Sequence, residues 1–273
     1  MSIQRLNANF SSVMKCGLCH RTVEKLSRSH IIPKSLLFHE QPQGAEEPLL
    51  LMPSNPEKRV ERSQSGVYSQ IVCADCEASF QRGDDALLDL CRNFENGVPV
   101  PDNGEAPLLK FYPTMDTSDL HRGVLGTLYR AHLSPHAAFN RVDLGEKHAE
   151  AIRRLLLSGQ PTDGSPYRVV LRSVPGVQGS VIGAPFRERW EGVNAYRVYF
   201  PHITAFVKVD QRPFRPPFHI AHLGALRFNG QPYPHVIVAE HLADAEKRLL
   251  AHVMAGRDDE VARYADRSRN TAG

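Results

Sequence analysis

Residues 16–19 read Cys16-Gly17-Leu18-Cys19, and residues 73–76 repeat this spacing as Cys73-Ala74-Asp75-Cys76. Each pair places two thiols one tight turn apart, which is how one knuckle supplies one side of a tetrahedral Zn²⁺ site. We therefore expect one structural zinc ion with four thiolate ligands: Cys16, Cys19, Cys73 and Cys76. The alternative is two unrelated pairs of buried cysteines, which is less expected in a chain with only 5 cysteines among 273 residues.

Other thiol and imidazole groups are weaker candidates. His20 follows the first pair directly and could compete as a ligand, but four thiolates already close a structural site. Cys91 lies in an apolar run and is expected to be a small buried residue. A thiol redox protein would need a low-pKa nucleophilic cysteine at a helix start, and two matched pairs argue against that class.

The composition limits which classes of protein this chain can belong to. With 41% hydrophobic and 23% charged residues, the chain is typical of a globular protein with a real core, and its length allows two units. The net charge of +3 is far from that of a nucleic-acid coat protein, although a local basic surface is enough to hold phosphates. Because we find no secretory signal pattern and no run of roughly 20 apolar residues, we expect a cytoplasmic protein without a membrane partner.

A specific motif lies between the two cysteine pairs. Residues 26–35 read Leu26-Ser27-Arg28-Ser29-His30-Ile31-Ile32-Pro33-Lys34-Ser35. With its flanking knuckles, this stretch resembles the HNH endonuclease superfamily, whose zinc-supported members carry a knuckle, then a strand ending in (Asp/His/Ser)-His-Ile-(Ile/Val)-Pro, then a second knuckle that opens a helix. The resemblance covers about residues 14–95, looks most like bacterial HNH proteins of unassigned biology, and extends weakly further along the chain. It implies a zinc-stapled ββα-metal module.

The resemblance also implies roles for single residues. His30 would be the general base that takes a proton from the attacking water, which suits a side chain that titrates near neutrality. Glu77 falls where members commonly carry a metal-binding Asn, and its carboxylate would hold Mg²⁺ or Mn²⁺ on the scissile phosphate. Ser29 stands where many active members carry an Asp or His ligand, so Asp84 or Asp85 could supply the missing group, unless both are solvent-facing helix charges. The last histidine of the superfamily's triad has no clear counterpart.

Two functions remain open at this point. The first is an Mg²⁺ or Mn²⁺ dependent endonuclease acting on nucleic acid, for which the resemblance favours double-stranded DNA and a setting such as a mobile element or phage defence. The second is a non-catalytic zinc module that recognises nucleic acid or protein, with His30 supporting the turn at Pro33. A protein partner or a homo-oligomer is compatible with either. Six basic residues could line a phosphate track or belong to an ordinary solvated surface: Arg28, Lys34, Lys58, Arg59, Arg62 and Arg82.

The predicted fold class is α+β, with an antiparallel sheet in the second half. The units are a zinc-stapled module at 1–100, a mixed α+β domain at 108–256 that positions substrate or partner, and a helix end with a loose tail at 257–273. In the module, apolar spacing predicts a helix from about Cys76 to Phe94, although Gly83 weakens its first turns. Residues 41–65 predict an irregular connection, and residues 101–107 a linker.

Periodicity also predicts the elements of the second unit. Helical spacing predicts helices at 118–132, 146–157 and 242–254. Strand-like composition predicts strands at 167–171, 195–200, 204–209 and 236–238. The histidines of this unit show no spacing typical of a metal site, so we expect no second site among His202, His219, His222, His235 and His241.

Overall fold

The computed structural model describes residues 13–37, 49–55, 61–63, 66–102, 105–160, 165–173, 182–190, 192–212 and 235–238. Within these ranges the chain is mixed α+β with antiparallel sheets, which confirms the predicted class. No helix in the same ranges is both long enough and apolar enough to cross a membrane.

Two small antiparallel strand pairs surround the cysteine pairs. Strand β1 (Met14–Lys15) pairs with β2 (Thr22–Val23), so that the two strands flank the first knuckle. Strand β3 (Ser27–His30) pairs with β6 (Tyr68–Val72), which leads directly into the second knuckle. Each knuckle is therefore held at the end of a short antiparallel strand pair.

Four helices follow these strands in the chain. They are α1 (Lys34–Leu37), α2 (Ala74–Arg92), α3 (Thr117–Leu133) and α4 (Gly145–Leu157). Helix α2 begins immediately after Cys73 and buries Phe80, Leu87 and Leu90, as the apolar spacing predicts. Asp116 caps α3, because its carboxylate accepts a hydrogen bond from the backbone N–H of Asp119.

The backbones of α2 and α3 touch where the helices cross. A Cβ atom on Gly123 would lie 2.3 Å from the carbonyl oxygen of Gly83, and a Cβ on Gly83 would lie 2.6 Å from the Gly123 nitrogen. The two backbones can come this close only because both residues are glycine. The close packing of α2 against α3 stabilises the fold by more than the poor helix propensity of Gly83 costs. Helix α2 is therefore continuous through the residue that weakened the prediction.

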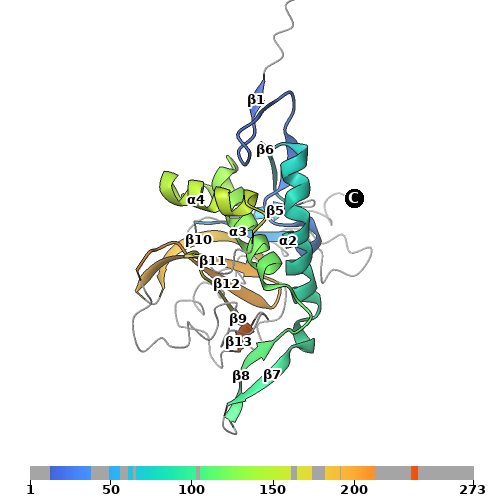
Figure 1. Ribbon diagram of the computed structural model, residues 1–273, viewed down its shortest axis with the longest axis vertical. Coiled ribbons are helices and arrows are strands. Elements are labelled where there is room, and N and C mark those ends of the chain that lie inside the picture. Colours follow the sequence, from blue (N-terminus) through green and yellow to red (C-terminus); the bar gives the residue numbers. More distant parts are fainter. Residues whose placement is uncertain are drawn as a thin grey trace, which may run out of the picture.

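The larger sheet has nine strands within the described ranges, in the order β5-β4-β10-β11-β12-β9-β13-β8-β7. Their bounds are β4 (Leu49–Met52), β5 (Glu61–Ser63), β7 (Val98–Asp102), β8 (Glu105–Phe111), β9 (Val169–Ser173), β10 (Ile182–Trp190), β11 (Val193–Phe200), β12 (Ile203–Lys208) and β13 (His235–Val238). Neighbours are antiparallel except β4 beside β10 and β13 beside β9. Helices α3 and α4 lie on one face of this sheet, where α3 contacts β10 and β12 (Figure 1). Two short 3₁₀ turns, Phe94–Asn96 and Ala137–Phe139, complete the described elements.

Most elements predicted for the second half are confirmed. Helices α3 and α4 match the predictions within one residue, and β11 and β12 match the two central strands. The strand predicted at 167–171 begins two residues later as β9, and the one at 236–238 lies within β13. Strand β10 has no predicted counterpart, because Gly183 and Pro185 obscure its strand pattern; both lie where the register shifts against β11.

The prediction of an irregular connection at 41–65 is wrong. This segment contains β4 and β5, and β4 pairs with β10, so the larger sheet supplies the hydrogen-bond partners that the local sequence does not reveal. The predicted linker at 101–107 contains the end of β7 and the start of β8, which pair as a hairpin. The predictions at 242–254 and 257–273 lie outside the described residues. One hydrophobic core contains residues of both predicted units, such as Phe80 and Leu125.

Candidate functional site

The four cysteines of the two knuckles form one cluster. One sulfur from each lies within 4.8 Å of the others, and the Sγ atoms of Cys19 and Cys73 are 3.8 Å apart. Four sulfurs about 2.3 Å from a central tetrahedral ion lie roughly 3.8 Å from one another, so the cluster could hold a metal ion such as zinc. Neither His20 nor Cys91 belongs to the cluster.

The backbone shapes both knuckles. The N–H of His20 donates to the carbonyl of Cys16 at 2.9 Å, and His20 adopts φ +61°, the left-handed conformation that closes this tight turn. The N–H of Cys73 donates to the Sγ of Cys16 at 3.2 Å, which joins the two knuckles directly. Because Cys73 precedes α2, the second pair lies at the N-terminal end of that helix, where backbone dipoles favour negative charge.

Arg21 lies beside the exposed side of the cluster. Its guanidinium donates to the Sγ of Cys19 at 3.3 Å and forms an ion pair with Asp75. Burial alone would raise the pKa of Cys19, but hydrogen bonds with Arg21, Cys16 and Cys76 together outweigh that effect and lower the pKa to about 6. Burial instead raises the pKa of Cys76. Arg21 thus offsets part of the negative charge that four thiolates would concentrate around a divalent ion.

Helices α3 and α4 of the predicted second unit hold the first knuckle in place. The hydroxyl of Tyr129 on α3 donates to the carbonyl of Gly17 at 2.9 Å, and Arg153 on α4 donates to the carbonyl of Leu18 at 2.9 Å. Glu150 accepts two hydrogen bonds from Arg153 and fixes its guanidinium. Burial raises the pKa of Tyr129 to about 12, so the phenol keeps the proton that it donates.

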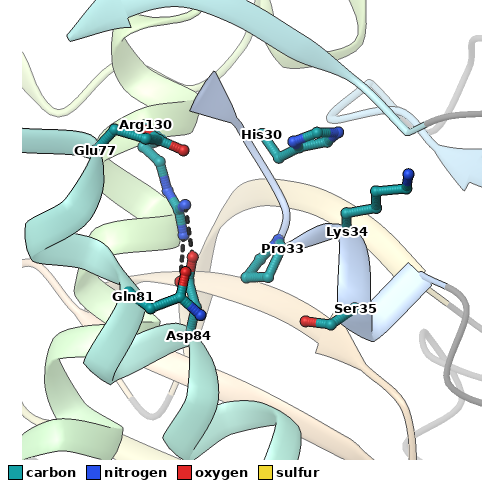
Figure 2. A pocket seen from close by; sticks show the side chains of 8 residues that line it. All are labelled: His30, Pro33, Lys34, Ser35, Glu77, Gln81, Asp84 and Arg130. Carbon is teal, nitrogen blue, oxygen red and sulfur yellow. Dashed lines mark hydrogen bonds and ion pairs between the residues drawn. The ribbon is translucent and has the colours of Figure 1, made fainter. Parts of the chain in front are cut away.

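A pocket of about 560 Å³ lies next to the cluster, between β3, α1, α2 and α3. Its lining residues are His30, Pro33, Lys34, Ser35, Glu77, Gln81, Asp84 and Arg130. Figure 2 shows His30 and the residues that follow it on one wall, with the side chains from α2 facing them across the pocket. Two of the sequence-predicted site residues, His30 and Glu77, therefore share one pocket.

His30 is the last residue of β3 and is half-buried. It lies opposite Tyr68 in the register with β6, and the two ring centroids are 6.1 Å apart. Its neighbour Ser29 points to the other face of the strand, is fully buried and does not line the pocket. Within the described ranges the Ser29 hydroxyl has no hydrogen-bond partner. The alternation of the strand thus separates Ser29 from the pocket that contains His30.

Glu77 brings a carboxylate to the pocket from the first turn of α2. Its backbone N–H donates to the carbonyl of Cys73 at 2.9 Å, so its position depends on the second knuckle. The Oε2 atom of Glu77 is buried, and no described residue offers it a hydrogen bond. Burying a polar oxygen without a partner costs free energy, so this atom is a candidate ligand for a cation.

Asp84 and Asp85 have different surroundings. Both carboxylate oxygens of Asp84 accept hydrogen bonds from Arg130, at 2.9 and 2.6 Å. Burial raises the pKa of Asp84, while Arg130 and, more weakly, His30 oppose the rise. Asp85 is exposed, accepts a hydrogen bond from Gln81 and does not line the pocket. Only Asp84 therefore lies with His30 and Glu77.

Arg130, like Gln81, is a pocket residue that sequence reasoning missed. Its side chain is 1% exposed, and its guanidinium also lies 4.7 Å from the ring of Phe80. A signal did exist in the sequence: Arg130 falls in the run 124–131 of α3, which is otherwise composed of apolar or small residues. A charged residue on a buried helix face generally has a charged partner.

The predicted phosphate track is only partly assembled. Lys34 lines the pocket and Arg28 is exposed on β3, two residues from His30, whereas Arg82 is paired with Asp119. The side chains of Lys58, Arg59 and Arg62 lie outside the described part. Among the histidines of the second half, His202 stacks on Phe94 with ring centroids 5.6 Å apart, which is a packing role.

The chain was also compared with known proteins. No family model matches it, and neither a curated protein nor a solved structure matches it.

Proposed function

We propose that this chain is a metal-dependent endonuclease that hydrolyses phosphodiester bonds of nucleic acid, with DNA as the favoured substrate. One observation carries the proposal: the pocket lined by His30 is also lined by Glu77, whose buried Oε2 has no hydrogen-bond partner among the described residues. A general base and an unpaired carboxylate in one pocket are the two groups that metal-assisted hydrolysis of a phosphodiester requires.

The local architecture supports the same reading. Strands β3 and β6 and helix α2 follow the ββα order of the superfamily that the motif at 26–35 resembles. A zinc ion in the four-cysteine cluster would fix the β3–β6 strand pair against the start of α2. Because Glu77 lies one turn after Cys73, such an ion would also fix the distance between His30 and Glu77. The zinc ion would have a structural role only.

Each of the pocket residues would have a different role in the reaction. His30 would accept the proton of the attacking water, as an imidazole can do near neutral pH. Lys34, at the pocket rim, would contact a phosphate oxygen of the substrate backbone. Glu77 would hold a Mg²⁺ or Mn²⁺ ion, which supplies charge neutralisation at the scissile phosphate. Asp84 would supply at most an outer contact, because Arg130 engages both of its oxygens.

The test is cleavage of supercoiled plasmid by the full chain with Mg²⁺ or Mn²⁺. We expect His30→Ala to lose about 100-fold or more of the wild-type rate, because a general base commonly contributes that much. Glu77→Gln should lose activity by weakening metal binding, so that raising the metal concentration restores part of the rate. The matched control is Glu95→Gln, an exposed carboxylate that pairs with Lys110 away from the pocket.

Zinc content and thermal stability are measured on each variant. Loss of cleavage in both variants with one zinc ion and an unchanged Tm supports the proposal. Cleavage that persists in His30→Ala at the wild-type rate would contradict it, as would a wild-type protein that binds zinc but cuts neither DNA nor RNA with either metal.

One observation favours a second candidate, a non-catalytic zinc module that recognises nucleic acid or protein. Arg130 engages both oxygens of Asp84, and Ser29 lies outside the pocket, so Glu77 is the one carboxylate there without such an ion pair. In that case His30→Ala would leave binding unchanged and only affect stability. The plasmid assay above separates the two functions.

A further inference from the structure

The outer face of the β3–β6 strand pair carries a continuous group of polar and aromatic side chains beside the pocket. Arg28 and His30 alternate with buried Ser29 along β3, so they lie on the same face. The register places Arg28 opposite Gln70 and His30 opposite Tyr68. Arg28, Tyr68 and Gln70 are exposed, and His30 connects them to the pocket.

Arg28 and Tyr68 form a flat cationic surface on this face. The Arg28 guanidinium carbon lies 3.6 Å from the centre of the Tyr68 ring, a close cation–π contact. Tyr68 nevertheless remains 40% exposed, which makes it one of the few large hydrophobic residues in the described ranges with that much surface in solvent. An ordered guanidinium and an exposed ring together offer planar surfaces on which another flat group can stack.

We infer that this face binds an unstacked nucleotide of single-stranded or locally unpaired nucleic acid, next to the phosphate that His30 acts on. The inference rests on the proposed function and adds the state of the substrate to it. In a duplex the faces of the bases are covered by their neighbours, so stacking on Arg28 or Tyr68 requires a base that has left the stack. Gln70 can donate and accept hydrogen bonds at the edge of such a base.

The order of two cations along the chain indicates a path for the nucleic-acid strand. Arg28 and Lys34 lie on opposite sides of His30 in the chain, and both are exposed cations. A nucleotide stacked beside Arg28 would have its neighbouring phosphate near His30 and the next one toward Lys34. This arrangement suits a nucleic-acid strand whose bases face the β3–β6 strand pair, whereas a duplex would offer its phosphates to this face and place no base on Tyr68.

The test measures binding without cleavage. Fluorescence anisotropy of the full chain in EDTA, at one fixed salt concentration, compares a single-stranded oligonucleotide with a duplex of the same sequence. We expect the single strand to bind about 10-fold more tightly, and Tyr68→Leu to weaken that binding about 10-fold, since stacking one base commonly contributes this much. Tyr68→Phe keeps the ring and should stay within about 2-fold of wild type. Arg28→Ala should weaken binding of the single strand more than Arg92→Ala, an exposed cation of α2 that serves as the control.

The two proposals fail in different ways. Equal or tighter binding of the duplex, or wild-type binding by both Tyr68→Leu and Arg28→Ala, would overturn the inference about the β3–β6 surface, whatever the plasmid assay shows. Tight single-strand binding that depends on Tyr68, in a protein that cuts no nucleic acid, would support the β3–β6 surface and overturn the nuclease alone. Zinc content and Tm show that each variant is folded.

Discussion

Arg130 of α3 donates hydrogen bonds to Asp84 of α2 from both terminal guanidinium nitrogens, at 2.9 and 2.6 Å. Arg130 is itself only 1% exposed. The ion pair joins the helix that follows the second knuckle to the helix that packs on the larger sheet. It also forms part of the pocket wall. Part of the candidate site is thus built by α3, which belongs to the predicted second unit.

Replacement of Arg130 should therefore lower the stability of the fold. Arg130→Met leaves the Asp84 carboxylate largely buried without its partner, and we expect the free energy of unfolding to fall by about 3–5 kcal/mol. Urea denaturation measures the loss. The matched control is Arg82→Met, which breaks an ion pair between an exposed guanidinium and the Asp119 carboxylate across the same two helices and should cost less, about 1 kcal/mol. Equal losses in the free energy of unfolding would show that the Arg130–Asp84 pair stabilises the fold no more than the Arg82–Asp119 pair.

Asp85 should be dispensable for cleavage, although the sequence alone makes it a candidate metal ligand. Its side chain is exposed and does not line the pocket, although it accepts a hydrogen bond from Gln81, which does. We expect Asp85→Asn to keep the wild-type rate of plasmid cleavage and the wild-type dependence on Mg²⁺. If Asp85→Asn needs a several-fold higher metal concentration, the carboxylate reaches the ion and our placement of the metal at Glu77 is incomplete.

The four-cysteine cluster should bind one zinc ion that the fold needs. Cys76→Ser is expected to lose the ion and several kcal/mol of stability, which in a chain of this size lowers Tm by about 10 °C. Metal analysis and a thermal melt measure both quantities. Cys91→Ser is the matched control, since Cys91 is equally buried but lies outside the cluster. Full zinc content in Cys76→Ser would contradict the four-thiolate site.

Tyr129 should make stability depend on alkaline pH. Burial raises its pKa from 10.0 to about 12, so between these values the unfolded chain releases a proton that the folded protein keeps. Stability from this group is complete below pH 10 and is lost as the pH rises toward 12. We expect Tyr129→Phe to cost about 1 kcal/mol at pH 7, through the lost hydrogen bond to Gly17, and to lose less stability than wild type between pH 9 and 11. Urea denaturation at the three pH values tests this, and parallel losses would contradict it.

The crossing of α2 and α3 should not tolerate a methyl group at Gly123. Alanine is a better helix former by about 1 kcal/mol, but its Cβ would meet the backbone of Gly83 at 2.3 Å. We expect Gly123→Ala to lower the free energy of unfolding by about 1–3 kcal/mol. Gly126→Ala, one turn later, meets only the Phe80 side chain at 3.1 Å and should cost less. The prediction is wrong if the two variants unfold at the same urea concentration.

The sequence by itself determined those features that depend on neighbours in the chain. Two matched Cys-x-x-Cys pairs indicated the cluster, and apolar residues at helical spacing indicated α3 and α4, because ligand spacing and helical periodicity are local properties. The motif around His30 indicated a strand end beside the cluster. The mixed α+β class followed from the same patterns.

Only the tertiary structure decided which distant groups meet. It placed Glu77 in the pocket of His30, excluded Asp85, tied Asp84 to Arg130, and joined β4 to β10. No local pattern encodes these partners, because each depends on how the helices cross and how the strands pair. A buried charge or an unpaired strand edge in the sequence shows that a partner is needed. Which residue or strand becomes that partner depends on tertiary packing.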